Sequence, residues 1–293
     1  MEKKKINFPA VLIVGEGKLT YSIAANALLM GQEVTMLVPD ADAARSAIEQ
    51  LIPNGKQRLT LLTDWPATLP HPLVVVITEE NNQAKQAVIG ELEPRIAADA
   101  VIAINTESIP LSELQVTSSS PGRIVGLNWC YPAHLTFFME IISNTQTLPS
   151  HVHFLETIAK EVWDKDSYTV TCGFSVRARM MAAWAREAFH LVENGFASME
   201  SIDRACRNDA GHYLPFAGNF RYMDLMGTYA YGIVMKDLNP ELSKMSAVPE
   251  SIINEFQRYA SVADTEVQEE IFLKFSKEIQ GLILKYNHET IDR

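Results

Sequence analysis

Hydrophobic residues at the start of the chain fall into short runs separated by a longer, periodic stretch. Residues 11–14 form an apolar run, and a glycine-rich turn follows at residues 15–17. Apolar residues then recur with helical spacing over residues 19–30, before a second apolar run at residues 34–38. Short apolar runs are typical of buried strands, and recurrence every three to four residues is typical of a helix. The segment 10–38 therefore predicts a strand, a turn, a helix and a second strand.

The same alternation continues as far as residue 171, and the pattern changes after residue 173. Further strands are predicted at residues 59–63, 73–77, 101–105, 124–129, 136–142 and 168–171, and further helices at residues 41–51, 82–96, 111–115 and 152–162. Later elements are helices at residues 176–193 and 199–207, a loop with Gly and Pro at residues 209–220, and two helices within residues 249–286. We expect an α/β protein: a Rossmann-type doubly wound sheet over residues 1–173, followed by an all-α domain over residues 174–293. A ligand cleft is expected between the two domains.

Composition narrows the class of protein and its partners. The chain has 293 residues, of which 47% are hydrophobic and 21% charged, as in ordinary globular proteins. The net charge of −11, with no basic run beyond residues 3–5, argues against binding to nucleic acid or to an anionic membrane. No apolar run is long enough to span a membrane, and the charged N-terminus leads directly into a strand, so a cytoplasmic protein is expected. The cysteines lack the spacing of a metal site and are expected to be reduced, mostly buried thiols: Cys130, Cys172 and Cys206.

The turn after the first strand has the chemistry of a dinucleotide site. Gly15 and Gly17 match the first two glycines of a G-x-G-x-x-G pattern, and Lys18 and Leu19 open the following helix. Glycines at these positions allow a tight turn and a close approach of the backbone to a pyrophosphate. The N-terminus of the helix offers N–H groups and the positive end of its dipole to the same anion. This turn therefore predicts NAD binding.

Two departures from the pattern leave the choice of cofactor open. Thr20 stands at the third glycine position, and the second strand ends at Val38 without the acidic residue that usually binds the adenosine ribose. Asp40 follows two residues later, where it either caps the helix at residues 41–51 or reaches the ribose. NADP is therefore not excluded.

Five segments, in the same order and at nearly the same spacing, resemble motifs of the 3-hydroxyacyl-CoA dehydrogenase family. In that family an N-T-S-S segment ends one strand, and a later G-x-H-F-F-N-P segment leads to a glutamate. The corresponding segments are EENNQAK (79–85), AINTESIPLSEL (103–114), RIVGLNWCYPAHLTFFMEII (123–142), TVTCGFSVRAR (169–179) and GNFRYMDLMG (218–227). The resemblance covers nearly the whole chain. It implies hydride transfer between NAD and a small 3-hydroxy or 3-keto substrate.

On the cofactor side, the residues that the resemblance implies are largely retained. Glu80, Lys85, Asn105 and Thr106 fall where the family places them. Lys85 would contact a hydroxyl or carboxamide of the cofactor, and Glu80 would cap the helix that it opens. A solvated helix start is the alternative for both.

The residues that carry the chemistry are largely replaced. In the family a histidine takes the hydroxyl proton of the substrate, and a glutamate orients that histidine. The histidine position holds Asn128, while the glutamate is retained as Glu140. Glu107 replaces a serine beside the substrate oxygen, and Arg177 replaces an asparagine that opens the helical domain. Because an amide does not accept a proton near neutral pH, Asn128 cannot be a general base.

Other residues are candidates for the proton acceptor, although a structural role is the simpler explanation of each. His134 follows Asn128 by six residues. Glu107 is expected near Asn128, where burial would raise its pKa, but an ion pair with Arg177 is equally compatible with the pattern. In the predicted loop at residues 209–220, the candidates are His212 and Tyr213.

The segment from Val38 to Leu59 is shorter than the resemblance implies. Leu59 lies only 21 positions after Val38, which leaves room for one helix and a turn, whereas family members carry a longer basic hairpin that contacts the CoA part of the substrate. Arg45, Lys56 and Arg58 are the basic residues that remain. A CoA thioester is therefore expected to bind weakly or in another way.

Three interpretations remain open. The first, which we favour, is an NAD(P)-dependent oxidoreductase of the 3-hydroxyacyl-CoA dehydrogenase class with an unusual substrate and a relocated base. The second is a non-catalytic dinucleotide-binding or structural protein on the same scaffold. The third is a dehydrogenase of the 6-phosphogluconate or 3-hydroxyisobutyrate type, which would use a lysine on the helix at residues 176–193, where this chain has none.

The resemblance also implies a homodimer that forms mainly through residues after Gly173. The helix at residues 176–193 and the last helix both carry many apolar residues, and an internal core is the alternative explanation for them. These residues are Met180, Met181, Trp184, Phe189, Leu191, Ile271, Phe272, Phe275, Ile279 and Leu282.

Overall fold

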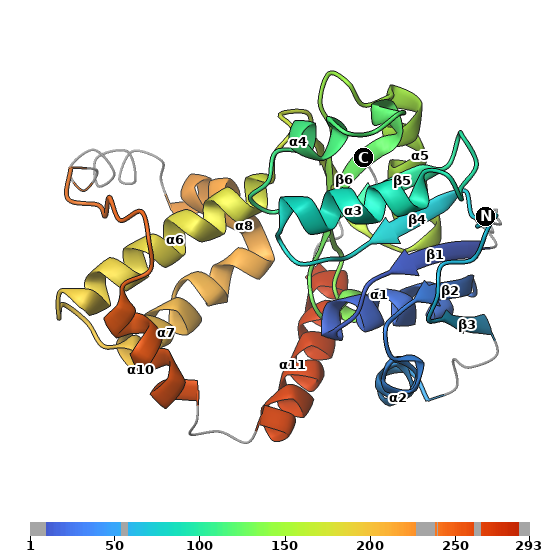
Figure 1. Cartoon of the computed structure of the whole chain (residues 1–293). Coiled ribbons are helices and arrows are strands. Elements are labelled where there is room, and N and C mark those ends of the chain that lie inside the picture. Colours follow the sequence, from blue (N-terminus) through green and yellow to red (C-terminus); the bar gives the residue numbers. More distant parts are fainter. Residues whose placement is uncertain (1–9, 54–57, 227–237, 239, 261–264, 287–293) are drawn as a thin grey trace. The chain divides into compact units, whose positions relative to one another are not determined.

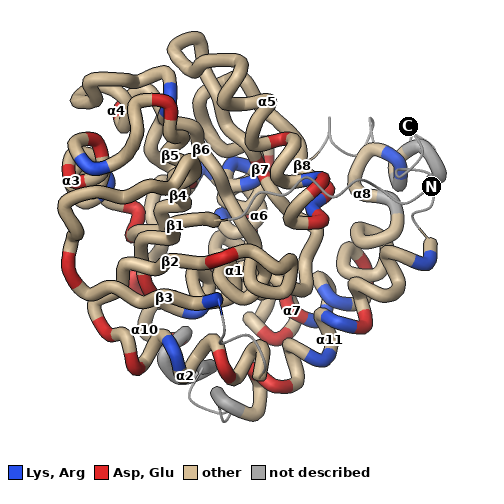
Figure 2. The backbone as a smooth tube through the Cα atoms, turned by 90° about the vertical axis from the view of Figure 1, so that its right-hand side faces the viewer, with Lys and Arg blue, Asp and Glu red and all other residues tan. Residues whose placement is uncertain are grey.

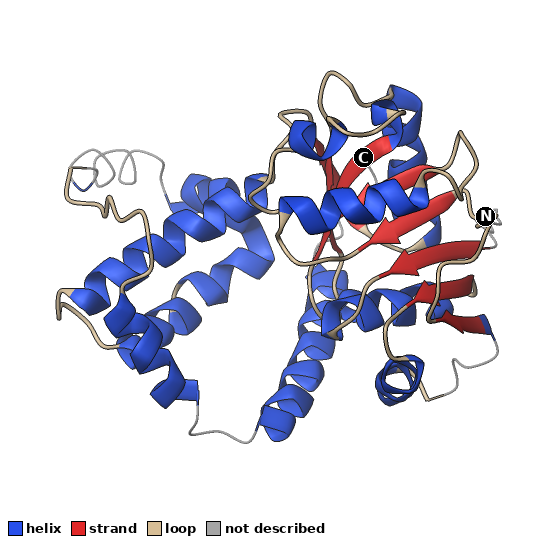
Figure 3. Cartoon of the chain, viewed as in Figure 1, coloured by secondary structure: helices blue, strands red, loops and turns tan. Residues whose placement is uncertain are grey.

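A computed structural model describes residues 10–53, 58–226, 238, 240–260 and 265–286 (Figure 1). The chain forms two compact units, residues 1–178 and residues 179–293. The first contains the sheet, and the described part of the second is helical (Figure 3). This architecture confirms the predicted fold class.

Eight strands form a single sheet in the first unit. They lie in the order β3-β2-β1-β4-β5-β6-β7-β8, and neighbours are parallel except for the antiparallel pair β6 and β7. Their bounds are β1 Ala10–Val14, β2 Glu33–Leu37, β3 Leu59–Leu62, β4 Leu73–Val76, β5 Val101–Ile104, β6 Ile124–Trp129, β7 Phe138–Ile142 and β8 Asp166–Val170. The strand order reverses between β1 and β4. In such sheets ligands bind outside the carboxyl ends of the strands at this point.

Helices cover both faces of this sheet. On one face α1 (Lys18–Leu29), α2 (Ala41–Leu51) and α5 (Pro149–Thr157) pack with a core that includes Val11 and Ile13. On the other face α3 (Asn82–Leu92) and α4 (Leu111–Gln115) pack with a core that includes Leu12 and Val14. Side chains on a strand alternate between the two faces, so β1 contributes to both cores. The strands carry few of the charged residues (Figure 2).

Several predicted elements end at different residues in the structure. α3 ends at Leu92 rather than at residue 96, because Pro94 lacks the N–H that would continue the helix. β7 begins at Phe138 because a 3-10 turn, η3 (Ala133–Leu135), precedes it. The helix predicted at residues 152–162 begins with Pro149 in its first turn and changes into a π-helical turn, η4 (Ile158–Val162).

The described elements of the second unit are helices. α6 (Val176–Glu193) begins in the first unit, and α7 (Met199–Asn208) follows. The loop predicted at residues 209–220 is wrong, because α8 spans Ala210–Met226. Pro215 lies inside α8, and at Gly218 the backbone is not helical, with φ of 66° and ψ of −175°, so α8 consists of two helical pieces that meet at a kink. The two helices predicted within residues 249–286 are confirmed as α10 (Glu250–Ala260) and α11 (Thr265–Tyr286).

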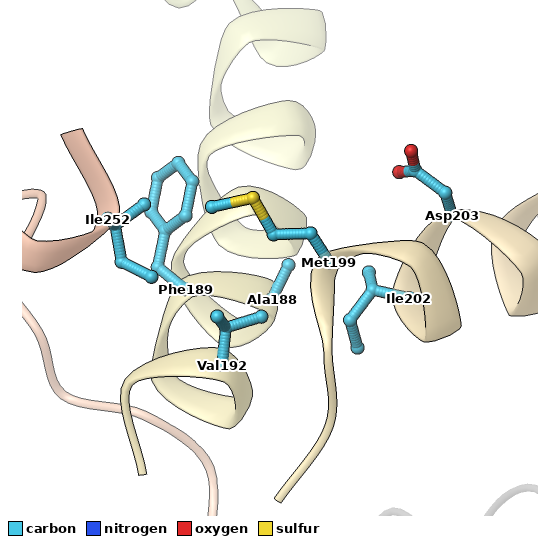
Figure 4. Close-up of a pocket in the computed structure, with 7 residues that line it drawn as sticks. All are labelled: Ala188, Phe189, Val192, Met199, Ile202, Asp203 and Ile252. Atoms are coloured by element: carbon cyan, nitrogen blue, oxygen red, sulfur yellow. The ribbon is translucent and has the colours of Figure 1, made fainter. Parts of the chain in front are cut away.

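A small apolar cavity of about 110 Å³ lies between α6, α7 and α10 (Figure 4). It is lined by Ala188, Phe189, Val192, Met199, Ile202, Asp203 and Ile252. None of the predicted site residues contributes to it.

All three cysteines are free thiols, but the prediction that they are mostly buried is wrong. Cys172 is exposed, and Cys130 and Cys206 are half-buried. Among the described helices, none has the length and apolar character needed to cross a membrane.

Candidate active site

The glycine turn after β1 has the backbone of an anion site. Gly15 has a φ of +133°, and a Cβ on it would lie 2.0 Å from the carbonyl oxygen of Ile77. Gly17 has a φ of +91°, no atom lies within 4 Å of the position of its Cβ, and no side chain caps α1 at this residue. Glycine backbone beside open space at a helix N-terminus suits a phosphate group. The residues at this turn therefore fit the pyrophosphate of a dinucleotide.

Asp40 caps a helix, which is one of the two roles considered from the sequence. Its Oδ1 accepts hydrogen bonds from the N–H groups of Asp42 and Ala43, both at 3.0 Å. These N–H groups lie in the first turn of α2, where no preceding turn of the helix supplies a carbonyl oxygen to accept them. Between β2 and β3, α2 is the one helix in the described residues, as the short segment predicts.

Lys85 joins the carboxyl ends of β4 and β5. Its side chain is fully buried, and Nζ donates to the carbonyl oxygen and Oδ1 of Asn105 at 2.7 and 2.9 Å and to Oγ1 of Thr78 at 3.3 Å. Burial lowers the pKa of Lys85, and the nearby Glu80 carboxylate opposes that shift. Because the ammonium group is enclosed, the geometry favours a supporting role for Lys85 over the cofactor contact expected from the sequence.

Glu80 holds the loop that follows β5. Its Oε1 accepts hydrogen bonds from the N–H groups of Glu107, Ser108 and Ile109 at 2.9, 2.7 and 3.0 Å. Burial would raise the pKa of Glu80, but these donors and Lys85 lower it below its ordinary value. The prediction that Glu80 caps α3 is wrong, because the side chain of Asn81 accepts the capping hydrogen bond from Ala84 N–H at 3.0 Å.

Glu140 on β7 is fully buried and is the acceptor of five hydrogen bonds. Burial would raise its pKa, but the donors lower it, so the carboxylate stays ionised. Oε1 accepts from the Tyr168 hydroxyl and the N–H groups of Val176 and Arg177, at 3.0, 2.9 and 3.1 Å. Oε2 accepts from Asn128 Nδ2 and the Ser175 hydroxyl, at 3.0 and 2.6 Å. Glu140 therefore fixes the first turn of α6, where Arg177 lies.

Asn128 on β6 is directly opposite Glu140 and has no amide hydrogen to spare. Nδ2 donates to Glu140 and to the carbonyl oxygen of Thr106 at 2.8 Å, and Oδ1 accepts from Thr106 N–H at 2.9 Å. Asn128 is 1% exposed. This side chain therefore links the loop after β5 to Glu140 on β7 and positions both. As an amide it does not titrate near neutral pH.

Glu107 and Arg177 form an ion pair, as one of the sequence alternatives predicts. Nη1 of Arg177 lies 2.7 Å from Oε1 of Glu107, and the two side chains are 33% and 37% exposed. The Arg177 guanidinium carbon also lies 5.3 Å from the centre of the Phe138 ring. The Phe138 ring packs edge-on against Tyr168 at 5.9 Å. Stacking and pairing together hold the guanidinium in place.

The pKa of Glu107 lies above its ordinary value. Burial is the largest cause, the carboxylates of Glu140 and Glu80 add to it, and Arg177 opposes it. A carboxylate with a raised pKa accepts a proton more readily. Because Asn128 does not titrate and Glu140 is saturated with donors, Glu107 is the best-placed proton acceptor among the four candidate catalytic residues.

His134 lies in η3 and is a poor base. Burial, together with the positive charge of Lys165, lowers its pKa to about 4. Nζ of Lys165 donates to the carbonyl oxygens of Ala133 and Thr136 at 2.5 and 2.6 Å, so it holds this turn in place. His212 and Tyr213 lie in α8 of the second unit.

Sequence analysis did not identify Tyr168, Ser175 or Phe138 as part of the site. Ser175 had a recognisable signal, because serine before a periodic helix is a typical N-cap, and its Oγ accepts a hydrogen bond from Ala178 N–H at 2.9 Å. Tyr168 lies opposite Glu140 in the register of β7 and β8. That pairing is a tertiary fact with no local signature.

Comparison with known proteins identifies the family of the chain. The model of the NAD-binding domain of 3-hydroxyacyl-CoA dehydrogenases matches residues 10–172, and that of the C-terminal domain matches residues 173–266. The chain belongs to the 3-hydroxyacyl-CoA dehydrogenase family. It is therefore a member of a family of NAD-dependent oxidoreductases, and the 6-phosphogluconate or 3-hydroxyisobutyrate type is set aside.

The chain is similar both to a relative named for a CoA thioester and to a relative named for a pyridine carboxylate. The 5-formyl-3-hydroxy-2-methylpyridine 4-carboxylate 5-dehydrogenase of Mesorhizobium japonicum is 29% identical over 243 residues, which cover 80% of this chain and 76% of that protein. A 3-hydroxybutyryl-CoA dehydrogenase of Mycobacterium tuberculosis is 28% identical over 238 residues, covering 73% and 81%. A crystal structure of an enzyme with the former activity, termed an NAD+-dependent dismutase, superposes with a TM-score of 0.81 at 22% identity, over 96% of this chain and 99% of that one. The last comparison supports the fold.

Proposed function

We propose that this protein is an NAD(P)-dependent oxidoreductase that transfers hydride to or from a 3-hydroxy or 3-keto substrate other than a standard acyl-CoA. The observation that carries the proposal is the Glu107–Arg177 pair. It places a carboxylate with a raised pKa and a cation where the resemblance implies two neutral side chains. The single helix α2, in place of a basic hairpin, supports a substrate without CoA. The relative named for a pyridine carboxylate supports it as well.

Glu107 takes the proton in this proposal. Arg177 is the one side chain in the described part of the chain that donates to Glu107, and it binds Oε1, so Oε2 retains its lone pairs for a substrate hydroxyl. The O–H proton passes to Glu107, the C–H electron pair leaves as hydride, and a carbonyl forms. When bound, NAD supplies the hydride acceptor. Asn128 and Glu140 act as positioning residues, because they fix the loop of Glu107 and the first turn of α6.

The cofactor is held, in this proposal, at the turn formed by Gly15, Gly17, Lys18 and Leu19. Asn105, supported by Lys85, lies at the end of β5. Because β2 is followed by Val38 rather than by a ribose-binding acid, we expect poor discrimination between NAD and NADP. Calorimetry with each dinucleotide on the wild type and on Gly17→Val tests this. Equal affinity of the two proteins, or no binding at millimolar concentration, would contradict it.

NADH formation at pH 7–9 tests the activity, with 3-hydroxybutyrate, its methyl ester and its CoA thioester as probes. We expect turnover of a probe without CoA and little turnover of the thioester. Glu107→Gln should lower the rate by about a hundred- to ten-thousand-fold, which is the usual contribution of a general base. Glu33→Gln, at an exposed position on β2, is the matched control and should leave the rate unchanged. Robust turnover of the thioester by Glu107→Gln would overturn the assignment.

A non-catalytic dinucleotide-binding protein is the second candidate function. The observation that favours it is the Asn128–Glu140 pair, whose hydrogen-bonding groups are all occupied within the protein and which therefore offers no free proton acceptor. Binding of NAD that is lost in Gly17→Val, without turnover of any probe, would support this alternative.

We also propose that the protein is a homodimer formed mainly by residues after Gly173. The support is the exposed apolar residues of α6 and α11. They include Met180, Met181, Trp184, Ile271, Phe272, Phe275 and Leu282, all at least 43% exposed.

A further inference from the structure

Arg177 combines features of a built anion site. Its backbone N–H is bound by the buried Glu140 carboxylate, and its guanidinium lies over the Phe138 ring. A third of the side chain is exposed. An arginine held in this way loses little conformational entropy when it binds a planar oxyanion.

The guanidinium also has donors that Glu107 does not use. Arginine offers five N–H donors, and in the described residues its one side-chain partner is Oε1 of Glu107, through Nη1. The pair is monodentate, with a single hydrogen bond, and both side chains are partly exposed. A partly exposed ion pair of this kind contributes little free energy, so a second carboxylate can compete with Glu107 for the guanidinium while the Phe138 ring still stacks on it.

We propose that Arg177 binds a carboxylate of the substrate and that this carboxylate replaces Glu107 as its partner. The inference rests on the proposed function and names its substrate class: small 3-hydroxy or 3-keto carboxylic acids with a free carboxylate. The exchange couples binding to chemistry. Burial and the carboxylates of Glu140 and Glu80 raise the pKa of Glu107, and Arg177 is the group that opposes them. When Arg177 turns to the substrate, Glu107 becomes a stronger proton acceptor at the moment that the hydroxyl is in place.

This proposal makes Glu107 a competitor in binding as well as a base in catalysis. Replacement of Glu107 by glutamine removes the intramolecular competitor, so the affinity for a carboxylate should rise while turnover falls. If the ion pair has only a structural role, its loss in Glu107→Gln would disorder the site, and the affinity for a carboxylate should fall.

Calorimetry with acetoacetate and methyl acetoacetate, each with and without oxidised NAD, tests the exchange. These probes share a 3-keto group and differ in charge. We expect the wild type to bind acetoacetate at least about tenfold more tightly than the ester, since a charge-assisted hydrogen bond is at stake. Arg177→Gln should remove that preference, Arg177→Lys should restore part of it, and Glu107→Gln should strengthen acetoacetate binding. Arg186→Gln, at an exposed position on the same helix, is the control and should behave as the wild type.

The outcomes separate this inference from the proposed function. Equal affinity for the acid and the ester, absence of acetoacetate binding at millimolar concentration, or weaker binding by Glu107→Gln would each overturn the exchange. None of these results depends on turnover. Preferential binding of the acid without NADH formation would keep the carboxylate site and overturn the catalytic assignment.

Discussion

The two units of this chain bury their apolar residues to very different extents. In the sheet unit β1, β4, β5 and β6 are buried almost throughout. In the helical unit α6 and α7 contain no buried residue, and α11 exposes Ile271, Phe272 and Phe275 by 43–57%. Burial of apolar surface is the main stabilising contribution to folding. The sheet unit therefore contains its own core, whereas the described helices of the other unit leave large apolar side chains exposed.

Polar residues differ between the units in the same sense. Glu140, Asn128 and Lys85 are buried in the sheet unit, and each binds several protein groups. In the described residues of the helical unit, ion pairs such as Arg204–Glu200 and Lys274–Glu270 lie on exposed helix faces. Exposed pairs of this type contribute little to stability. Substitution in the buried network should therefore lower the free energy of unfolding far more than substitution of an exposed residue in the helical unit.

The largest effect is expected for Glu140→Gln. An amide has one acceptor oxygen and adds two donors, so it leaves buried donors of Tyr168, Ser175 or the α6 backbone without an acceptor. Each unsatisfied buried group costs roughly 1–3 kcal/mol, and we expect a loss of about 3 kcal/mol or more in the free energy of unfolding. Urea denaturation of the full chain measures it. The exposed Glu250→Gln on α10 is the control. A loss below about 1 kcal/mol would break the contrast between the units.

The next effect concerns assembly. Phe275→Asp places a charge on the exposed face of α11, where it should disrupt a dimer contact at little cost to the fold of the chain. We expect the wild type to show a dimer mass by light scattering at micromolar concentration and the variant to show a monomer mass. Gln268→Asp, at an exposed polar position on the same helix, introduces the same change of charge and is the control. A monomeric wild type would mean that the apolar face serves another purpose.

A smaller effect is expected from pH in the turn before β7. The folded chain holds the pKa of His134 at about 4, below the ordinary 6.5, because of burial and Lys165. Between these two pH values the unfolded chain binds a proton at His134 that the folded chain does not bind. The contribution of His134 to stability is therefore fully present above pH 6.5 and is lost as the pH falls through 4. His134→Asn should reduce this acid sensitivity by on the order of 1 kcal/mol, once solvent screening is considered. Thermal denaturation at pH 5 and pH 7 measures it, with the exposed His153→Asn as control. An unchanged pH dependence would show that folding does not lower the pKa of His134.

The sequence predicts the sheet unit well because its signals are local. Apolar runs, Gly15 and Gly17 mark the strands and the cofactor turn, and the structure has them at those positions. Prediction failed where partners are distant in the chain: Glu80 binds Glu107, Ser108 and Ile109 rather than its own helix. At residues 209–220, Gly and Pro indicated a loop, yet the chain bends at Gly218 within α8. The Glu107–Arg177 pair spans 70 residues, so the sequence could suggest it through a resemblance but could not establish its geometry.

The smallest effect is expected for restoring a histidine at position 128. Asn128 is 1% exposed and uses both amide hydrogens and its oxygen, so an imidazole there must break bonds to Thr106 before it can meet a substrate. General base catalysis is typically worth about a hundred- to ten-thousand-fold in rate. We expect Asn128→His to gain less than about tenfold, because Glu107 and Arg177 still line the site. NADH oxidation with acetoacetyl-CoA measures it, with Asn128→Gln as the variant that changes size without adding a base. A gain of a hundredfold would show that the family's usual chemistry was lost at this one residue, and that Glu107 need not have replaced it.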